Sequence, residues 1–236
     1  MQVANSLVAD VDHFRDMMTG AQVLDYLEDR LRSLGATRFL ATGIPLPGRP
    51  IAPLVLRANW GDYRGDKPNS LNISQSDPLL QAVLRARRSF EWPTPSDGTG
   101  PDSLLEALAG ASGEIRLIGV PVAAFPPYQA CVLGGGAALA LDRRAMLALD
   151  YFCTEAFARL FDLNFVRRER PGDLSARERR VVELSAVGKT ASDIATLLKI
   201  SQRTVHAHLQ NASEKLRASN KTHTVVEALR YGQIEV

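Results

Sequence analysis

The sequence predicts an α+β protein in two parts, an N-terminal α/β/α sandwich with an antiparallel sheet and a C-terminal four-helix unit with a helix-turn-helix. Three observations lead to this prediction. Apolar segments of strand type alternate with amphipathic segments over the first two thirds of the 236 residues. Four short amphipathic segments fill the last quarter. A charged segment with a Pro-Gly pair, 167–173, separates the two parts and is typical of a linker. The predicted domains are therefore 1–166 and 174–236.

The first helix and strands are defined by apolar spacing and by turn residues. Residues 12–34 are predicted to form a helix that ends at Gly35. Its inward face carries Val23, Leu24, Leu27 and Leu31. Segments 37–44 and 52–59 are short and apolar, as strands are, and the residues between them are rich in proline and glycine. These two segments therefore read as neighbouring strands joined by a turn.

The rest of the N-terminal part continues the mixed pattern. A helix is expected at 76–88, because Ser76 or Asp77 can cap it and Pro78 suits its first turn. The remaining segments are, in order, a loop at 92–103, a short helix at 103–111, strands at 115–125 and 128–141, and a long amphipathic helix at 143–161. A sandwich of this kind usually encloses or borders a pocket, but the pattern alone does not show one.

Each helix of the C-terminal unit starts at a capping signal or an apolar repeat. Ser175 with Glu178 forms a capping box, Thr190 with Asp193 gives a second N-terminal cap, and Ser201 caps the third helix. The expected helices are 176–188, 191–199, 202–218 and 222–232. The residues expected to face inward in the first three helices are Val181, Val182, Leu184, Ser185, Ile194, Ala195, Leu197, Leu198, Val205, Leu209, Ala212 and Leu216.

Gly188-Lys189-Thr190 matches the end of a phosphate-binding P-loop, which makes a nucleotide site an alternative for this unit. That motif needs a second glycine five residues before Gly188, so that the backbone can wrap the phosphates. Position 183 is a glutamate, and no apolar strand precedes it. The nucleotide site is therefore rejected in favour of a helix end followed by a turn.

Composition and charge exclude several classes of protein. The net charge is +2, but the segment 170–236 has 11 Lys and Arg against 7 Asp and Glu, as expected for a small nucleic-acid module on a slightly acidic body. Cys131 and Cys153 match no metal-ligand spacing and read as reduced core thiols of a cytoplasmic protein. The N-terminus lacks the features of a signal peptide, and no apolar run approaches the length of a transmembrane helix.

The second and third helices of the C-terminal unit are separated by a short turn, as in a helix-turn-helix whose second helix enters the DNA major groove. Opposite the apolar seam of the third helix lie Gln202, Arg203, His206 and Gln210, which suit base edges and phosphates. Lys189, Thr190, Ser201 and Thr204 stand near helix N-termini, where phosphates bind well. For each residue the alternative is a solvated polar surface, but together they favour binding of double-stranded DNA.

The whole C-terminal unit resembles the LuxR-type helix-turn-helix. The matching residues include Leu174, Arg177, Glu178, Gly188, Lys189, Ile194, Ala195, Ser201, Thr204, Val205, His208, Asn211, Lys215, Leu216 and Gly232. The resemblance implies that the segment from Gln202 to Gln210 reads DNA and that the last helix forms a dimer contact. A homodimer implies a two-fold symmetric DNA site. RNA polymerase is a further candidate partner.

The segment 15–165 resembles the autoinducer-binding domain of quorum-sensing LuxR regulators through Asn59-Trp60, Asp77-Pro78, Trp92, and Gly119 with Pro121. The resemblance implies an N-acyl-homoserine lactone as the small-molecule ligand and no other cofactor. Asp77 would accept the amide N–H, and Trp92 would pack over the lactone ring. Trp60 stands where family members often place a tyrosine that meets the acyl carbonyl. The alternatives are a simple helix cap for Asp77, a core aromatic for Trp92, and a close backbone approach at Gly119.

The chain departs from the family pattern just after Trp60. Family members usually place a tryptophan where this chain has Arg64, with Tyr63 beside it, and a tyrosine where it has Pro68. Arg64 could donate to a ligand carbonyl or lie in solvent, because an unpaired guanidinium is costly to bury. The ligand could then be an unusual lactone, another small molecule, or none, which would make the protein an orphan regulator.

An enzyme with a DNA-binding tail is the alternative from a different class. The four histidines are His13, His206, His208 and His223, and three of them lie in the expected DNA-binding unit. No set of nucleophile, base and acid and no metal-ligand cluster is visible in the sequence. The sequence therefore indicates a ligand-responsive transcriptional regulator rather than an enzyme.

Overall fold

The computed structural model describes residues 2–45, 49–60, 63–64, 77–92, 116–125, 128–166 and 174–235. The chain forms two compact units. The first contains Met1–Pro45, Pro50–Ala124 and Ala130–Arg167, and the second is built around Arg168–Val236. The predicted linker 167–173 lies outside the described residues, so the exact domain boundaries stay predictions.

A sheet with the strand order β3-β2-β1-β6-β5-β4 forms the centre of the first unit. In the described part of the chain its strands are β1 (Arg38–Gly43), β2 (Val55–Trp60), β3 (Tyr63–Arg64), β4 (Phe90–Trp92), β5 (Arg116–Phe125) and β6 (Tyr128–Gly136). The pairs β1–β2, β1–β6, β2–β3 and β4–β5 are antiparallel. The predicted antiparallel sheet is therefore confirmed.

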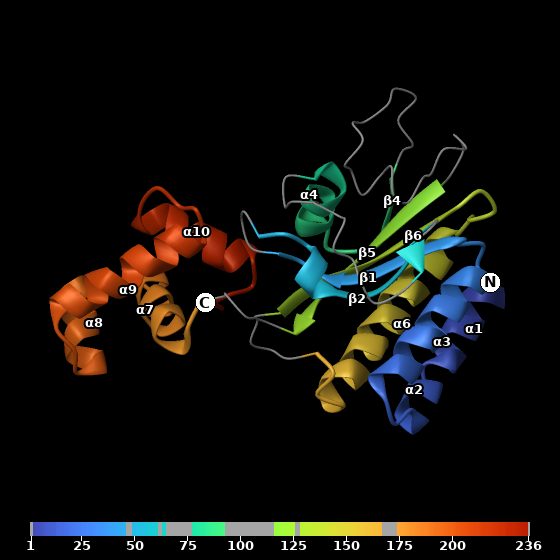
Figure 1. Cartoon of the computed structure of the whole chain (residues 1–236), viewed down its shortest axis with the longest axis horizontal. Helices are drawn as coiled ribbons and strands as arrows, with labels where there is room; N and C mark the ends of the chain where they lie inside the picture. The colour runs from blue at the N-terminus through green and yellow to red at the C-terminus, as the bar shows by residue number, and fades with distance from the viewer. Residues whose placement is uncertain are drawn as a thin grey trace. The chain divides into compact units, whose positions relative to one another are not determined.

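Helices cover both faces of this sheet (Figure 1). They are α1 (Gln2–Asp10), α2 (His13–Asp16), α3 (Gly20–Ser33), α4 (Pro78–Arg85) and α6 (Arg143–Asp162), with a short 3-10 turn, η1 (Ala52–Leu54), before β2. Helices α3 and α6 lie on one face, α1 packs along α6, and α4 lies on the other face. This arrangement confirms the predicted α/β/α sandwich.

The two faces of the sheet are buried in different cores because side chains alternate along each strand. Toward α4, nine buried residues form what we call the α4-face cluster: Leu40, Ile44, Ile51, Leu79, Leu80, Val83, Leu117, Cys131 and Leu133. Toward α3, Gly134 leaves room for Leu31, since a Cβ at Gly134 would lie 3.2 Å from Leu31 Cδ2. Each large apolar side chain buried in this way stabilises the fold by about 1.5–3 kcal/mol.

The N-terminal helices differ from the sequence prediction. The expected helix 12–34 is divided into α2 and α3, because Thr19 caps α3 in a capping box with Gln22. The Thr19 N–H donates to Gln22 Oε1 (3.0 Å), and the Gln22 N–H donates to Thr19 Oγ1 (3.3 Å). The threonine-to-glutamine spacing is visible in the sequence and marks the break. Helix α1 was not predicted.

Two further predictions of the N-terminal part need correction. The strand expected at 128–141 ends at Gly136, because its partner β1 starts at Arg38, which pairs with Gly135. Trp92 was assigned to the start of a loop, but it is the last residue of β4 and pairs with Leu117. The short helix expected at 103–111 lies outside the described residues.

The second unit contains the four expected helices, α7 (Ala176–Ala186), α8 (Ala191–Leu198), α9 (Gln202–Lys215) and α10 (Lys221–Arg230). Val181, Ile194 and Val205 lie at the centre of its core and are fully buried. Leu197 was expected to face inward but is 57% exposed, because the short helix α8 packs on its neighbours along one side only. Helix α9 ends earlier than expected, at Lys215, where Arg217 adopts a left-handed backbone conformation (φ 51°).

No helix within the described ranges combines the length and the apolar character that crossing a membrane requires.

Candidate DNA-binding surface and ligand site

The turn between α8 and α9 has the geometry of a helix-turn-helix. Helix α8 ends at Leu198, the next residue, Lys199, has a left-handed backbone (φ 54°), and α9 starts at Gln202 behind the cap Ser201. The Thr204 N–H donates to Ser201 Oγ (3.0 Å), which closes the first turn of α9. The left-handed residue reverses the chain within a very short span, so α8 and α9 are held at a fixed angle.

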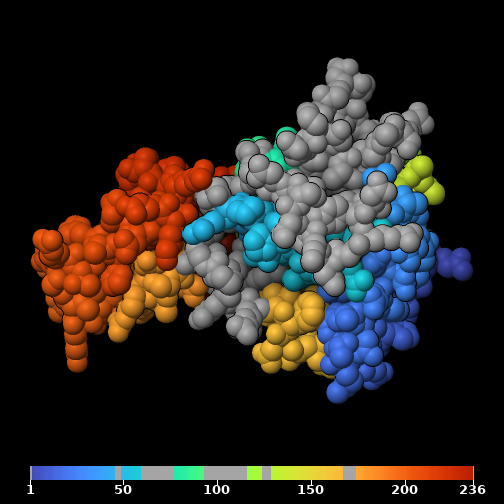
Figure 2. All heavy atoms as spheres, in the orientation of Figure 1, coloured from blue at the N-terminus to red at the C-terminus, as the bar shows by residue number. Residues whose placement is uncertain are grey.

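Packing of α9 against α7 and α8 leaves its opposite face open to solvent. Val205 is fully buried in the core of this unit, and Leu209 packs against that core. The four residues predicted to reach DNA bases, Gln202, Arg203, His206 and Gln210, are all exposed. Figure 2 shows side chains of α8 and α9, coloured orange, at the surface of the second unit. An exposed polar helix face behind a short turn is the arrangement that fits a major groove.

Three of the four residues predicted to hold phosphates, Thr190, Ser201 and Thr204, take part in helix caps. Both the N–H and the hydroxyl of Thr190 donate to Asp193 Oδ2, at 2.9 and 2.7 Å. These bonds lower the pKa of Asp193 and keep its carboxylate charged. Lys189 is exposed, and Lys221 reaches its backbone oxygen through Nζ (3.1 Å). Lys221 is therefore a second cation beside Lys189 that the sequence reading missed, because it lies 32 residues away on another helix.

Helices α7 and α9 are joined by a buried ion pair. Glu178 Oε2 accepts from Lys215 Nζ (2.7 Å) and also from the Ser175 N–H (2.7 Å). The Glu178 side chain is only 6% exposed. Burial alone would raise the pKa of this carboxyl, but the bonds from Lys215 and Ser175 outweigh it and lower the pKa. The pair holds α9 against α7.

Replacing Arg203 by alanine is expected to weaken binding to a specific DNA site by about 1–3 kcal/mol and to relax base preference at one position. The site is first selected from a random duplex pool, and the dissociation constant is then measured by fluorescence anisotropy at several salt concentrations. Arg180→Ala is the charge-matched control, because Arg180 pairs with Glu183 (3.0 Å) on α7. His206→Ala and Gln210→Ala should also weaken binding; unchanged affinity in all three α9 variants would reject the groove-facing assignment.

On the first unit, Asp77 is a buried carboxylate at the start of α4. It is 8% exposed, and its Oδ1 accepts from the N–H groups of Leu79 (2.9 Å) and Leu80 (3.4 Å). Burial and the nearby charge of Asp77 raise the pKa of the Cys131 thiol to about 12. The carboxylate thus caps α4 and lies near Cys131 of β6, a member of the α4-face cluster. Asp77 is therefore the cap of α4, as one of the two sequence interpretations expected. Capping does not exclude ligand binding, because a carboxylate has about four acceptor positions.

Trp92 and Gly119 meet on the same side of the sheet. Trp92 is half-buried and packs against the α4-face cluster, with its ring centroid 6.4 Å from that of Phe90. Gly119 pairs with Phe90, and a Cβ at this position would lie 2.5 Å from Phe90 Cζ. Any side chain at position 119 would therefore clash with the Phe90 ring, so this position requires glycine. Sequence reasoning missed Phe90, although its place two residues before Trp92 puts both on one face of a strand.

The other three predicted ligand residues lie at the end of β2 and in β3. Trp60 pairs with Tyr63, and Asn59 pairs with Arg64, so the three belong to one hairpin. Their side chains lie outside the described part of the structure, so only their backbone positions are given. The structure therefore brings Asp77, Trp92 and Gly119 together at one cluster, and the roles of Trp60, Tyr63 and Arg64 stay predictions.

A separate hollow of about 430 Å³ lies between residues 86–88, β5 and α6. Of the predicted ligand residues whose side chains are described, Asp77, Trp92 and Gly119, none lines this hollow. It is therefore distinct from the surroundings of Asp77 and Trp92.

The chain is similar in sequence to known bacterial transcriptional regulators. The family model of bacterial regulatory proteins of the luxR family matches residues 173–228. Transcriptional activator protein BjaR1 of Bradyrhizobium diazoefficiens is 30% identical over 212 residues, covering 88% of this chain and 87% of BjaR1. The quorum sensing-dependent regulator RpaR of Rhodopseudomonas palustris is 27% identical over 217 residues, covering 91% of this chain and 89% of RpaR. Both relatives are transcriptional regulators and not enzymes.

Solved structures support the two-part fold. The structure of SdiA in complex with octanoyl-rac-glycerol covers 97% of this chain and 95% of the SdiA chain, with a TM-score of 0.53 and 20% identity. A crystal structure of Escherichia coli SdiA gives a TM-score of 0.51 at 19% identity, covering 99% of this chain and 98% of that chain. At this identity the likeness shows the fold.

Proposed function

Because the chain belongs to the LuxR family of transcriptional regulators and carries the DNA-binding helix-turn-helix of that family, we propose that it is a quorum-sensing regulator controlled by an N-acyl-homoserine lactone. In this proposal the first unit binds the lactone, and a homodimer binds a two-fold symmetric DNA site. Ligand binding shifts the population toward the form that binds DNA, because only the ligand-competent fold gains the binding free energy.

The observation that carries the ligand proposal is a buried carboxylate beside an apolar cluster and a tryptophan. An acyl-homoserine lactone has one amide N–H, two carbonyl groups and an apolar tail. Asp77 offers a buried acceptor for the amide, and Trp92 offers an apolar ring surface. Burying the amide without an acceptor would cost free energy, so the carboxylate would favour an amide-bearing ligand over a plain fatty chain.

The homodimer proposal is supported by the outer surface of α10. Val226 and Leu229 are three residues apart on this helix and are 52% and 43% exposed. Two large apolar side chains at this spacing form a stripe that a second copy of the helix could cover. The same helix carries the dimer contact that the family resemblance implies.

A second candidate is an orphan regulator that binds a different small molecule or acts without ligand. The specific observation behind it is the solved SdiA structure, whose bound molecule is octanoyl-rac-glycerol. An acylglycerol has hydroxyl groups that can donate to a carboxylate in place of an amide N–H. Asp77 would therefore also suit a monoacylglycerol.

Thermal unfolding of the purified full-length protein tests the proposal. The panel contains N-butanoyl-, N-hexanoyl-, N-octanoyl-, N-dodecanoyl- and aroyl-homoserine lactones, together with octanoylglycerol. A ligand at 100 times its dissociation constant adds about 2.7 kcal/mol to the free energy of unfolding. For a chain of this size we expect the unfolding temperature to rise by roughly 5–10 °C.

The ring-opened acyl-homoserine is the matched control for each lactone. It keeps the acyl chain and the amide but adds a carboxylate, which the charge of Asp77 would repel. We expect no shift with this control. A shift with octanoylglycerol alone would favour the second candidate, and no shift with any compound would reject both ligand classes.

A further inference from the structure

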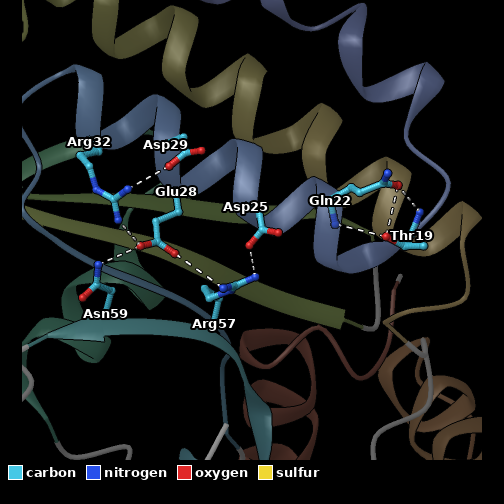
Figure 3. A network of polar contacts seen from close by, with 8 residues as sticks. All are labelled: Thr19, Gln22, Asp25, Glu28, Asp29, Arg32, Arg57 and Asn59. Carbon is cyan, nitrogen blue, oxygen red and sulfur yellow. Dashed lines mark hydrogen bonds and ion pairs between the residues drawn. The ribbon is translucent and has the colours of Figure 1, made fainter. Parts of the chain in front are cut away.

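A network of polar side chains joins α3 to β2 on the face of the sheet opposite α4 (Figure 3). Helix α3 contributes Asp25, Glu28, Asp29 and Arg32, and β2 contributes Arg57 and Asn59. Within this network, Asp29 bonds only to Arg32 of its own helix (2.9 Å). The links between helix and strand run through Asp25 and Glu28.

Glu28 is the centre of these links. Its Oε1 accepts from Asn59 Nδ2 (2.8 Å) and from Arg32 Nη2 (2.7 Å), and its Oε2 lies 3.9 Å from Arg57 Nη1. The Glu28 side chain is 12% exposed, whereas that of Asp25, which pairs with Arg57, is 58% exposed. Exposed ion pairs contribute little to stability because water screens them, whereas a carboxylate withdrawn from water holds its partners more firmly.

Strand β2 depends on such side-chain contacts more than a central strand does. Its neighbour β3 is only two residues long, and its register with β1 is irregular between Ala41 and Thr42. On the opposite face, Val55 and Ala58 of β2 pack against the α4-face cluster, where Asp77 and Trp92 lie. A displacement of β2 would therefore move one wall of the proposed ligand site.

The Glu28–Asn59 bond acts at the end of β2 from which the ligand hairpin starts. Asn59 is directly followed by Trp60 and pairs with Arg64, and Trp60 pairs with Tyr63. Fixing Asn59 therefore fixes the backbone that carries all three predicted ligand residues of this hairpin. Residues that hold a binding group in place from behind commonly affect affinity although they do not touch the ligand.

We propose that Glu28 is a positioning residue for the ligand site: its carboxylate holds Asn59 and thereby the backbone of the paired residues Trp60, Tyr63 and Arg64. This inference rests on the proposed function. It assigns no ligand contact to Glu28 itself, which acts from the far side of the sheet through Asn59.

The test uses fluorescence of the full-length protein, whose two tryptophans are Trp60 and Trp92. In a Trp92→Phe background, Trp60 is the only tryptophan and reports on the end of β2 without any ligand. Glu28→Ala and Asn59→Ala are expected to change its emission maximum and its quenching by acrylamide in the same direction. Asp29→Asn, at a 69% exposed carboxylate on the same helix, is the matched control and should change neither.

A second arm measures ligand affinity with the lactone that gives the largest thermal shift in the wild-type protein. Glu28→Ala should weaken binding about tenfold. The double variant Glu28→Ala/Asn59→Ala should weaken it no further than either single change, because both act through one contact. Glu28→Gln keeps one acceptor oxygen, so its ligand affinity should lie between those of wild type and Glu28→Ala. If the alanine variant does not fold, Glu28→Gln takes its place in both arms of the test.

The two arms separate this inference from the proposed function. If the wild-type protein binds no lactone, the proposed function fails, and the Trp60 fluorescence still decides whether Glu28 holds β2. Unchanged Trp60 fluorescence in Glu28→Ala overturns the inference, as do fully additive losses of affinity in the double variant.

Discussion

Glu178→Ala is expected to lower the free energy of unfolding of the DNA-binding unit by about 2–4 kcal/mol. The change removes the acceptor of the Ser175 N–H and the carboxylate that pairs with Lys215, both at 2.7 Å. Hydrogen exchange of the α7 and α9 amides in the full-length protein measures this loss directly, because it reports the opening free energy of these helices alone. Calorimetry of the same variant should show a lower unfolding temperature.

Glu178→Gln separates the two roles of the side chain. Glutamine can keep the capping box with Ser175, but it cannot pair with Lys215 as a charge. We expect this variant to lose less stability than Glu178→Ala. Glu183→Ala on the same helix is the control, because Glu183 pairs with Arg180 near the surface and such pairs contribute at most about 1 kcal/mol. Equal losses of stability in Glu178→Ala and Glu183→Ala would show that the buried Glu178–Lys215 pair adds no more stability than a surface pair.

The same carboxylate predicts how stability depends on pH. The pKa of Glu178 is lowered in the folded protein, so its carboxylate stabilises the fold fully at a pH above the ordinary pKa of 4.5. This stabilisation is lost as the pH falls through the lower pKa of the folded state. Wild-type α7 and α9 should therefore open more easily below about pH 4.5. Glu178→Gln should lack this part of the acid dependence. Hydrogen exchange of the α7 and α9 amides in both proteins, measured from neutral to acidic pH, tests this expectation.

Much of the fold follows from local signals in the sequence. Ser175, Thr190 and Ser201 cap the helices they were expected to cap, because a capping side chain bonds to residues two or three positions away. Thr19 with Gln22 gave an equally local signal that divides the first predicted helix. The apolar spacing of Val205 and Leu216 also placed one side of α9 in the core.

Other features depend on residues far apart in the chain. The end of β6 is set by the start of β1, about a hundred residues earlier, and the exposure of Leu197 is set by how few helices surround α8. The bond between Glu28 and Asn59 joins two elements 31 residues apart, and no local spacing predicts it. The candidate ligand residues were named through a family resemblance, and local physics supplied only the capping role of Asp77.

Asp77→Ser is expected to reduce the ligand response strongly while leaving the ligand-free protein about as stable as wild type. Serine caps helices about as well as aspartate, so the N–H groups of Leu79 and Leu80 keep an acceptor. The serine hydroxyl is shorter and uncharged, so the buried acceptor for a ligand amide is lost. Removing a buried charged partner of this kind costs about 2–5 kcal/mol of binding free energy, which weakens binding from about thirtyfold to several thousandfold.

Comparison with Asp77→Ala completes the separation of capping from ligand binding. Alanine removes both functions, so this variant should lose about 1 kcal/mol of stability without ligand as well as the response to the lactone. Thermal unfolding of the three proteins with and without the best lactone measures both quantities in one experiment. If Asp77→Ser keeps the full ligand shift, Asp77 is only the cap of α4, and the acceptor for the ligand amide must be sought elsewhere in the first unit.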